Sequence, residues 1–487
     1  MNRQIVKLFG LVVALFAVLI GFTSYWSVFD AKALKEKDAN ARPLLEQQQI
    51  KRGRILAADG TVIARSVPKG HGAGLRYVRR YPEGTLYGHP IGYSFVDEGD
   101  SEFEQFHNDE LVGNESEFSS ILDQLSGRSQ EGSDIVTNLD PAAQKVALGD
   151  LEAAGYGAVV AIEPQSGRVK VLASNPPYDP NRVPYELSKL NTNEAERPLY
   201  DRATQGQYPP GSTFKVVTAA AGLESGAITP ETQIDAPGEL EVEGTPLRND
   251  FGISWPGATL DTALTNSVNT WFGQLGQRLG EDTLFEYMER FGFNSTPAID
   301  LPADQVSKSG VYDAEKEELL GPNDPVDLAR VAIGQERLVV TPLQMAEVAA
   351  AVANKGKLMK PQIWSRVVDP DGRVTKRLAP SEYSQPISAE TAEELTTAME
   401  GVVREGTGTN AEIPGVPVAG KTGTAETPGN KACGGGEEEN QAWFIGFAPA
   451  EDPKIAIAAT VECTEEFGND VAAPIFRDVA ETILNGE

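Results

Sequence analysis

The feature that most constrains this chain is an uncharged stretch close to its start. Residues 8–29 read LFGLVVALFAVLIGFTSYWSVF, 22 consecutive residues without an acidic or basic side chain. A helix of this length would be about 33 Å long, which is enough to cross the hydrocarbon core of a bilayer. Arg3 and Lys7 precede it, so the positive-inside rule predicts residues 1–7 in the cytoplasm and the rest of the chain outside. The alternative is a cleaved signal peptide ending near residues 31–33, but the apolar run is longer than a usual signal core.

The composition of the 487-residue chain limits the chemistry it can carry. Its length predicts two or three structural units. It has 42 Lys and Arg against 71 Asp and Glu, and the net charge of −29 repels phosphate, which argues against nucleic-acid binding through a basic face. Two cysteines, Cys433 and Cys463, and three histidines cannot build a zinc framework, and no metal or cofactor is expected. The histidines (His71, His89 and His107) all lie early, so later chemistry must manage without imidazole.

Residues 30–135 are predicted to form a β-rich module that follows the anchor. Within it, residues 51–66 predict short strands around an Asp59-Gly60 turn. Residues 97–117 hold nine acidic residues and no Lys or Arg. Such a charge run is typical of a solvated face or loop, and no function is assigned to it.

The rest of the chain, residues 136–487, changes from strand to helix patterns and back. Residues 156–174 predict a hairpin. Helical patterns dominate much of residues 212–404, and a closing helix is expected to begin at Pro474. Three late strands are predicted at residues 418–428, 441–449 and 454–463. Strands at both ends with helices between them predict an α+β domain whose first and last segments share one sheet.

The first of three short motifs is Ser212-Thr213-Phe214-Lys215. The pattern predicts a helix that starts at Ser212, and the three-residue spacing places Ser212 and Lys215 on one face, about 5–6 Å apart at Cβ. A serine hydroxyl becomes a good nucleophile when a base takes its proton, and a buried lysine with a lowered pKa can be that base. Alone, a serine at this position is most often a helix cap. A second copy of the spacing, Ser66-Val67-Pro68-Lys69, contains a proline that argues against a helix.

The second motif, Ser267-Val268-Asn269, is predicted in a loop between two helices. Ser267 can relay a proton between a base and a leaving group, and Asn269 can hold a substrate amide with its donor and its acceptor. Read singly, the same residues also fit a polar turn or a helix start.

The third motif is Lys421-Thr422-Gly423-Thr424, which is predicted to enter a late strand. Gly423 leaves room for an approaching substrate backbone. Lys421 offers a fixed cation to a substrate carboxylate, and the hydroxyl groups of Thr422 and Thr424 can hydrogen-bond it. A similar triplet, Lys308-Ser309-Gly310, has no strand pattern around it.

Each of the three motifs alone is weak evidence for a catalytic site, but the three together are stronger evidence. Their order, their spacing and their predicted positions agree, and the lack of a late histidine leaves lysine as the base. With the segments KRGRILAADG and GAVVAIEPQSGRVKVLAS, they make the chain resemble the class B penicillin-binding proteins. Its compact length is similar to that of the actinobacterial penicillin-binding protein A type.

The resemblance implies a serine β-lactamase/penicillin-binding transpeptidase fold, in which an antiparallel sheet is flanked by helices and joined to an all-helical subdomain. The implied activity is that of a serine-type peptidoglycan D,D-transpeptidase in cell wall biogenesis, acting on D-Ala-D-Ala stem peptides and inhibited by β-lactam antibiotics. The implied domains are a cytoplasmic N-terminus (1–7), a single-pass transmembrane anchor (8–29), a dimerisation-like pedestal module (30–135) and an extracytoplasmic penicillin-binding transpeptidase domain (136–487).

The resemblance also implies roles for the motif residues. Four side chains take part in acyl transfer: Ser212 as nucleophile, Lys215 as general base, Ser267 as proton relay to the leaving amine, and Asn269 as the group that orients the substrate amide. The third motif binds the terminal carboxylate through Lys421, Thr422 and Thr424, beside Gly423. The backbone N–H groups of Ser212 and Thr424 form the oxyanion hole.

Two further expectations concern partners and cysteines. The module between anchor and transpeptidase domain is too short for a glycan-polymerising domain, so the resemblance implies a membrane-embedded glycan polymerase of the SEDS type as partner. If the late strands form a meander, Cys433 and Cys463 lie at the same end of the sheet. In an oxidising compartment they are then predicted to form a disulfide.

Four other functions use or mimic the same motifs. A D,D-carboxypeptidase would let water resolve the acyl-enzyme, and a non-catalytic cell-wall scaffold would act through the pedestal module alone. A β-lactamase would need a deacylation base, for which the sequence offers no clear candidate. A β-lactam sensor would need a cytoplasmic output domain. The acceptor amine, the choice between division and elongation, and the oligomeric state stay open.

Overall fold

The structure is a computed structural model whose described residues fall into two compact units. The first unit comprises Met1–Lys51 with Val67–Val78, and the second comprises Arg52–Ser66 with Arg79–Glu487. The residues that the structure describes are 2–25, 48–113, 131–193, 196–313, 318–426 and 440–486.

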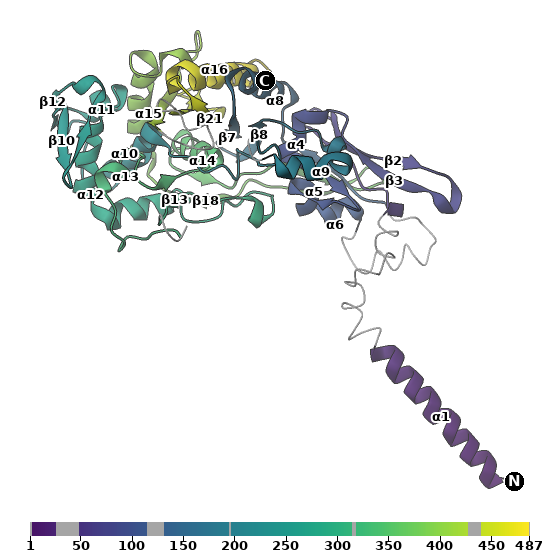
Figure 1. Cartoon of the computed structure of the whole chain (residues 1–487). Coiled ribbons are helices and arrows are strands. Elements are labelled where there is room, and N and C mark those ends of the chain that lie inside the picture. The colour runs from purple at the N-terminus through teal and green to yellow at the C-terminus, as the bar shows by residue number, and fades with distance from the viewer. Residues whose placement is uncertain are drawn as a thin grey trace. The chain divides into compact units, whose positions relative to one another are not determined.

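The first unit contains one long helix, α1 (Asn2–Ser24; Figure 1). Its window Arg3–Phe22 has a mean hydropathy of 2.7 and is entirely exposed, and no other helix among the described residues is long and apolar enough to cross a membrane. The helix begins ahead of the predicted anchor because Arg3 and Lys7 are good helix formers. Residues 26–29 of the predicted anchor lie outside the described residues.

A six-stranded sheet joins distant parts of the chain. In spatial order its strands are β17 (Val374–Arg377), β16 (Trp364–Val368), β6 (Asp134–Thr137), β1 (Ile55–Leu56), β2 (Val62–Lys69) and β3 (Arg76–Arg80). The pairing of β1 with β2 confirms the turn predicted at Asp59 and Gly60. β6 pairs with β1 in parallel and with β16 antiparallel, so a hairpin from residues 364–377 completes a sheet that begins at residue 55.

Part of the acidic segment is buried, which corrects the prediction of a solvated face. It forms two short helices, α5 (Glu102–Phe106) and α6 (Asn108–Val112). Glu104 is fully buried and accepts hydrogen bonds from Arg52 at 2.9 Å and from Arg79 at 2.5 Å. Burial alone would raise the pKa of Glu104, but the two guanidinium groups outweigh it and hold the pKa below its ordinary value. A local charge count misses this burial because the partners are distant in sequence.

A five-stranded antiparallel sheet carries both ends of the larger domain. In spatial order its strands are β19 (Ala419–Glu426), β20 (Asn440–Ala448), β21 (Ile455–Thr464), β7 (Gly157–Glu163) and β8 (Arg168–Asn175). The pairing of β7 with β21 confirms that the first and last segments share one sheet. Alternate residues of β7 enter two cores, since Val159 packs with α8 (Pro141–Ala154) and α16 (Gly468–Gly486), whereas Val160 packs with α14 (Pro342–Ala353; Figure 1).

Helices and two small pairs of antiparallel strands fill the region between these strands. The helices are α10 (Lys215–Glu224), α11 (Leu260–Thr265), α12 (Asn269–Arg290) and α15 (Ala389–Arg404), and the paired strands are β9 (Ile234–Ala236) with β12 (Trp255–Ala258) and β10 (Glu239–Val242) with β11 (Thr245–Arg248). The predicted helices are thus confirmed, and the two strand pairs lie between α10 and α11. The closing helix α16 begins at Gly468 and not at Pro474, which lies in its second turn.

We expect Glu104→Ala to lower the free energy of unfolding by about 3–5 kcal/mol, because it leaves two buried guanidinium groups without their shared carboxylate. Chemical denaturation followed by circular dichroism measures the change. The matched control is Glu286→Ala, which removes an exposed partner of Arg290 and should cost about 0.5 kcal/mol or less. Equal effects of the two substitutions would contradict the role given to Glu104.

Candidate active site

Ser212 lies in a single 3₁₀ turn, Gly211–Phe214, that runs directly into α10. The helix predicted to start at Ser212 is therefore present, but its α-helical part begins at Lys215. Gly211 has a φ of +52°, and a Cβ there would lie 2.9 Å from Thr424 O, so glycine is required. The N–H of Gly211 donates to Gly334 O at 3.0 Å. The turn therefore lies close against β19 on one side and is bonded to the segment at Gly334 on another.

Lys215 is fully buried, and its amine is the centre of the site. Nζ lies 3.0 Å from Ser212 Oγ, 3.1 Å from Ser267 Oγ, 2.8 Å from Ser267 O and 2.6 Å from Asn269 Oδ1. Two of these partners, the Ser267 carbonyl and the Asn269 amide oxygen, can only accept hydrogen bonds. A neutral amine has two N–H groups for them and one lone pair left, which can accept the proton of a serine hydroxyl.

Burial and a second lysine favour the neutral form of this amine. Burial is the largest cause that lowers the pKa of Lys215, and the positive charge of Lys421 adds to it, while Asp250 opposes both. Lys421 is also fully buried, which lowers its pKa to about 7 against the same opposing charge of Asp250. Two neighbouring amines that disfavour simultaneous protonation can serve as one base and one cation.

Ser267 lies in the connection between α11 and α12, as the sequence predicts, and Asn269 is the first residue of α12. Ser267 has a φ of +55°, in the left-handed region that residues with side chains rarely adopt and that is enriched at functional sites. Asn269 contacts Lys215 through Oδ1, and its Nδ2 donates to Arg248 O at 2.8 Å. Each end of the Asn269 amide therefore has one bond within the protein and the capacity for one more.

β19 is the edge strand of the five-stranded sheet, and it carries the third motif. Lys421 Nζ donates to Thr422 O at 3.2 Å. The two threonine hydroxyl groups have partners in the protein: Thr422 Oγ1 lies 2.7 Å from Thr407 Oγ1, and Thr424 Oγ1 accepts from the Gly468 N–H at 3.2 Å. An edge strand presents backbone N–H and C=O groups with which an extended peptide can pair.

Gly423 is required by the packing of the protein itself. A Cβ there would lie 2.7 Å from Pro210 O and 2.9 Å from Thr213 Cγ2. The side of β19 that lacks a side chain at this point therefore faces the turn that holds Ser212. The sequence predicts that this glycine leaves room for a substrate backbone. The structure adds a second reason, because a larger residue would push β19 away from Ser212.

Three residues that the sequence analysis did not single out shape the site. Asp250 follows β11, and its negative charge opposes the lowering of the pKa of both lysines. Gly334 has a φ of +79°, and a Cβ there would lie 1.9 Å from Gly211 O. Trp443 of β20 donates from Nε1 to Pro209 O at 3.0 Å. Only Gly334 offers a sequence signal, that of an isolated glycine between two helical patterns, and it is a weak one.

The other predictions concern residues away from these motifs. The second Ser-x-x-Lys sequence lies in β2, which confirms that it does not form a helix. Cys463 lies near the end of β21, whereas Cys433 lies outside the described residues, so the disulfide stays a prediction. Within the described part of the chain, no group of three or more His, Cys, Asp or Glu side chains is placed to hold a metal ion.

Comparison with known proteins finds relatives of both modules. Residues 157–481 match the penicillin binding protein transpeptidase domain, and residues 52–135 match the penicillin binding protein A dimerisation domain. Over the full length of both proteins, the chain is 33% identical to the peptidoglycan D,D-transpeptidase PbpA of Mycobacterium tuberculosis.

Solved structures have the same fold. Penicillin-binding protein A of M. tuberculosis, solved as a ceftriaxone acyl-enzyme complex, is similar with a TM-score of 0.80 at 32% identity, over 90% of this chain and 100% of that chain. The D,D-transpeptidase domain of a peptidoglycan glycosyltransferase from Eggerthella lenta is similar with a TM-score of 0.77 at 34% identity, over 90% and 99% of the two chains. These similarities confirm the predicted penicillin-binding transpeptidase fold.

We expect Lys421→Met to change how stability varies with pH. Folding lowers the pKa of Lys421 from its ordinary 10.5 to about 7, so between these values the unfolded chain binds a proton that the folded chain does not. The cost of burying the charge is fully present below pH 7 and is removed as the pH rises to about 10.5, by up to about 1.4 kcal/mol per pH unit.

The wild-type protein should therefore gain unfolding free energy relative to Lys421→Met as the pH rises from about 7 to about 10. Denaturation at a series of pH values measures this difference. Lys308→Met is the matched control, because Lys308 is an exposed lysine in the other Lys-x-Gly triplet. A difference between wild type and Lys421→Met that stays constant over the whole range would exclude the lowered pKa.

Proposed function

The chain belongs to the class B penicillin-binding protein transpeptidases, and we propose that it is a serine-type peptidoglycan D,D-transpeptidase with Ser212 as its nucleophile. The observation that carries the proposal is the 3.0 Å contact between Ser212 Oγ and the buried Lys215 amine, whose pKa is lowered. The M. tuberculosis relative is named a peptidoglycan D,D-transpeptidase and forms an acyl-enzyme with a β-lactam, which supports the same chemistry here.

In the proposed first step, Ser212 attacks the carbonyl carbon of the penultimate D-Ala of a stem peptide. Lys215 takes the hydroxyl proton, a C–O bond forms, and the C–N bond to the last D-Ala breaks. Ser267, whose Oγ lies 3.1 Å from the Lys215 amine, passes a proton to the leaving amine. An amine of a neighbouring stem peptide then attacks the ester, which releases Ser212 and forms the cross-link.

Substrate binding is proposed along the edge strand β19. The Lys421 cation, with the hydroxyl groups of Thr422 and Thr424, would hold the terminal carboxylate of the stem peptide. Because the pKa of Lys421 is about 7, binding of a carboxylate near neutral pH would draw a proton onto this amine. The backbone N–H groups of Ser212 and Thr424 would stabilise the oxyanion, and Asn269 would use its remaining bonding capacity to orient the substrate amide.

The arrangement in the cell is also a proposal. Residues 1–7 would be cytoplasmic, residues 8–29 the anchor, residues 30–135 the pedestal module and residues 136–487 the extracytoplasmic transpeptidase domain. The basic Arg3 and Lys7 at the start of an apolar helix support this orientation. The match of residues 52–135 to a dimerisation domain supports a single transpeptidase activity, with glycan polymerisation supplied by a SEDS-type membrane partner.

We expect Ser212→Ala to abolish covalent labelling by penicillin, and Lys215→Ala to slow it by about 10²–10⁴-fold because the base is removed. Intact-protein mass spectrometry over time, followed by peptide mapping, measures the rate and the site of the adduct. Lys69→Ala is the matched control, since it removes the lysine of the other Ser-x-x-Lys sequence and should be labelled at the wild-type rate.

Circular dichroism should show that all three variants remain folded. Wild-type labelling of Lys215→Ala would exclude this lysine as the base. An adduct on a peptide without Ser212 would exclude the proposed nucleophile.

The acceptor distinguishes transpeptidation from hydrolysis. We expect a D-Ala-D-Ala stem peptide to give cross-linked product whose share of the total rises with the concentration of an acceptor amine, because amine and water compete for one acyl-enzyme. Liquid chromatography with mass spectrometry measures both products. Hydrolysis alone at every amine concentration would favour a D,D-carboxypeptidase, and the absence of both products together with an unlabelled Ser212 would favour a non-catalytic scaffold.

A further inference from the structure

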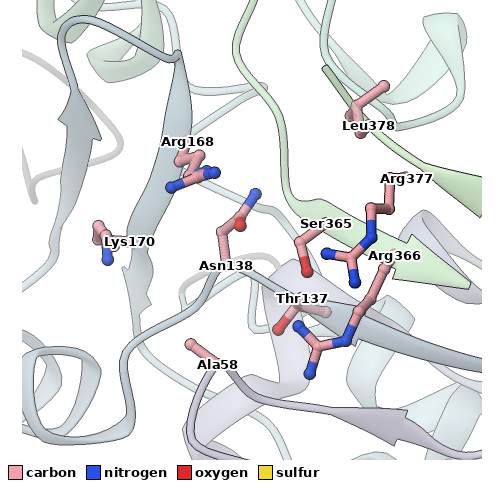
Figure 2. Close-up of a pocket in the computed structure, with 9 residues that line it drawn as sticks. All are labelled: Ala58, Thr137, Asn138, Arg168, Lys170, Ser365, Arg366, Arg377 and Leu378. Atoms are coloured by element: carbon pink, nitrogen blue, oxygen red, sulfur yellow. The ribbon is translucent and has the colours of Figure 1, made fainter. Parts of the chain in front are cut away.

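A cavity of about 350 Å³ lies where the six-stranded sheet meets the start of β8, and basic side chains line it (Figure 2). Arg366 and Arg377 come from β16 and β17, and Arg168 and Lys170 come from β8. None of the described residues that line the cavity is acidic, although the whole chain has a net charge of −29. The cavity is therefore a local reversal of the charge of the protein.

Arg366 and Arg377 lie directly opposite each other on the paired strands. Like charges in this position repel each other and destabilise a sheet. The other basic residues of this hairpin are neutralised, since Arg373 pairs with a neighbouring aspartate at 3.0 Å and Lys376 pairs with Glu110 at 3.0 Å. In the described part of the chain, no carboxylate forms an ion pair with Arg366 or Arg377, so both charges remain available to a ligand.

Arg168 and Lys170 lie on the other side of the cavity (Figure 2). Arg168 has one acidic neighbour, Glu163, at 3.4 Å. Asp140 is close to Lys170, because its N–H donates to Lys170 O, but its carboxylate accepts two backbone N–H groups at the start of α8. The side chains that line the cavity therefore include four cations, and of these only Arg168 has a printed ion pair with a carboxylate.

Neutral polar side chains hold the walls of the cavity in place. Asn138 donates from Nδ2 to the backbone carbonyls of residues 362 and 364, both at 3.0 Å. The hydroxyl groups of Ser365 and Thr137 each donate to a backbone carbonyl, at 3.1 Å and 3.0 Å. Because these donors are engaged with the backbone, the groups left to bind a ligand are the guanidinium and ammonium groups, which bind anions.

We propose that this cavity is a binding site for a phosphate-bearing ligand, namely a diphosphate or two closely spaced phosphate esters. Arginine side chains match phosphate oxygens in pairs, and several cations around one cavity are balanced better by a diphosphate than by a single carboxylate. A small ligand meets this local charge, whereas a nucleic acid would also meet the negative field of the rest of the protein. The cavity shares no residue with the three motifs, so the proposal does not depend on the proposed function.

Isothermal titration calorimetry with inorganic diphosphate tests the proposal on the full chain in phosphatidylcholine nanodiscs. We expect saturable binding by the wild type, affinity weakened by about tenfold or more in Arg377→Gln, and no measurable binding by the double variant Arg366→Gln/Arg377→Gln. Arg377 is exposed, so its substitution should leave the fold intact. Labelling of each variant by penicillin checks that the protein is folded.

Arg373→Gln is the matched control, because Arg373 belongs to the same hairpin, carries the same charge and lies outside the cavity. It should bind diphosphate as the wild type does. Equal weakening by Arg373→Gln would show an effect of net charge alone and would overturn the proposal. Absence of diphosphate binding by the wild type would overturn it as well.

The phosphate groups can belong to a lipid headgroup or to a soluble molecule, and a second arm of the experiment distinguishes these sources. The titration is repeated in nanodiscs that also contain cardiolipin, whose headgroup carries two phosphate esters. Weaker binding of diphosphate in these nanodiscs than in nanodiscs of phosphatidylcholine alone would identify a lipid headgroup as the competing ligand. Unchanged binding would identify a soluble phosphate compound.

Discussion

Lys215 is a buried amine whose contacts are hydroxyl, carbonyl and amide oxygens, and the rest of the site depends on it. An ammonium group in such surroundings is costly, so the free energy favours the neutral amine, and the nearby charge of Lys421 favours it further. Four contacts within 3.1 Å also require two separate chain segments, residues 212–215 and residues 267–269, to meet at one nitrogen atom. Both the neutral charge of the amine and its contacts therefore require a fold that buries Lys215 between these segments.

Glycines let those segments approach one another. The turn that holds Ser212 touches β19 through Gly211 and Gly423, and it touches a third segment through Gly334. At each of these positions a Cβ would lie within 3.0 Å of a backbone oxygen, so even alanine would force the backbone apart. A displacement of about 1 Å is enough to weaken a catalytic arrangement, which makes these glycines part of the site although they carry no reactive group.

The sequence predicts the site well where the signal is local. The spacing of Ser212 and Lys215 follows from helix geometry, and the sheet shared by β7 and β21 follows from strands at both ends of one domain. Contacts between distant segments outside the three motifs were not predictable. The sequence around Glu104 does not indicate that two arginines bind it. The sequence around Asn269 does not indicate its bond to the Arg248 carbonyl. When a residue has several possible partners, the actual partner can be identified only from the folded structure.

The six-stranded sheet has a consequence for the order in which the chain is made. Its strands β1 and β6 are complete early in synthesis, but β16, which pairs with β6, and β17, which pairs with β16, follow more than 200 residues later. Until those residues emerge, β6 presents an unpaired edge, and such edges recruit other chains. The N-terminal module is therefore expected to need the help of chaperones while the rest of the chain is made. Fragments that stop before residue 377 should be prone to aggregate.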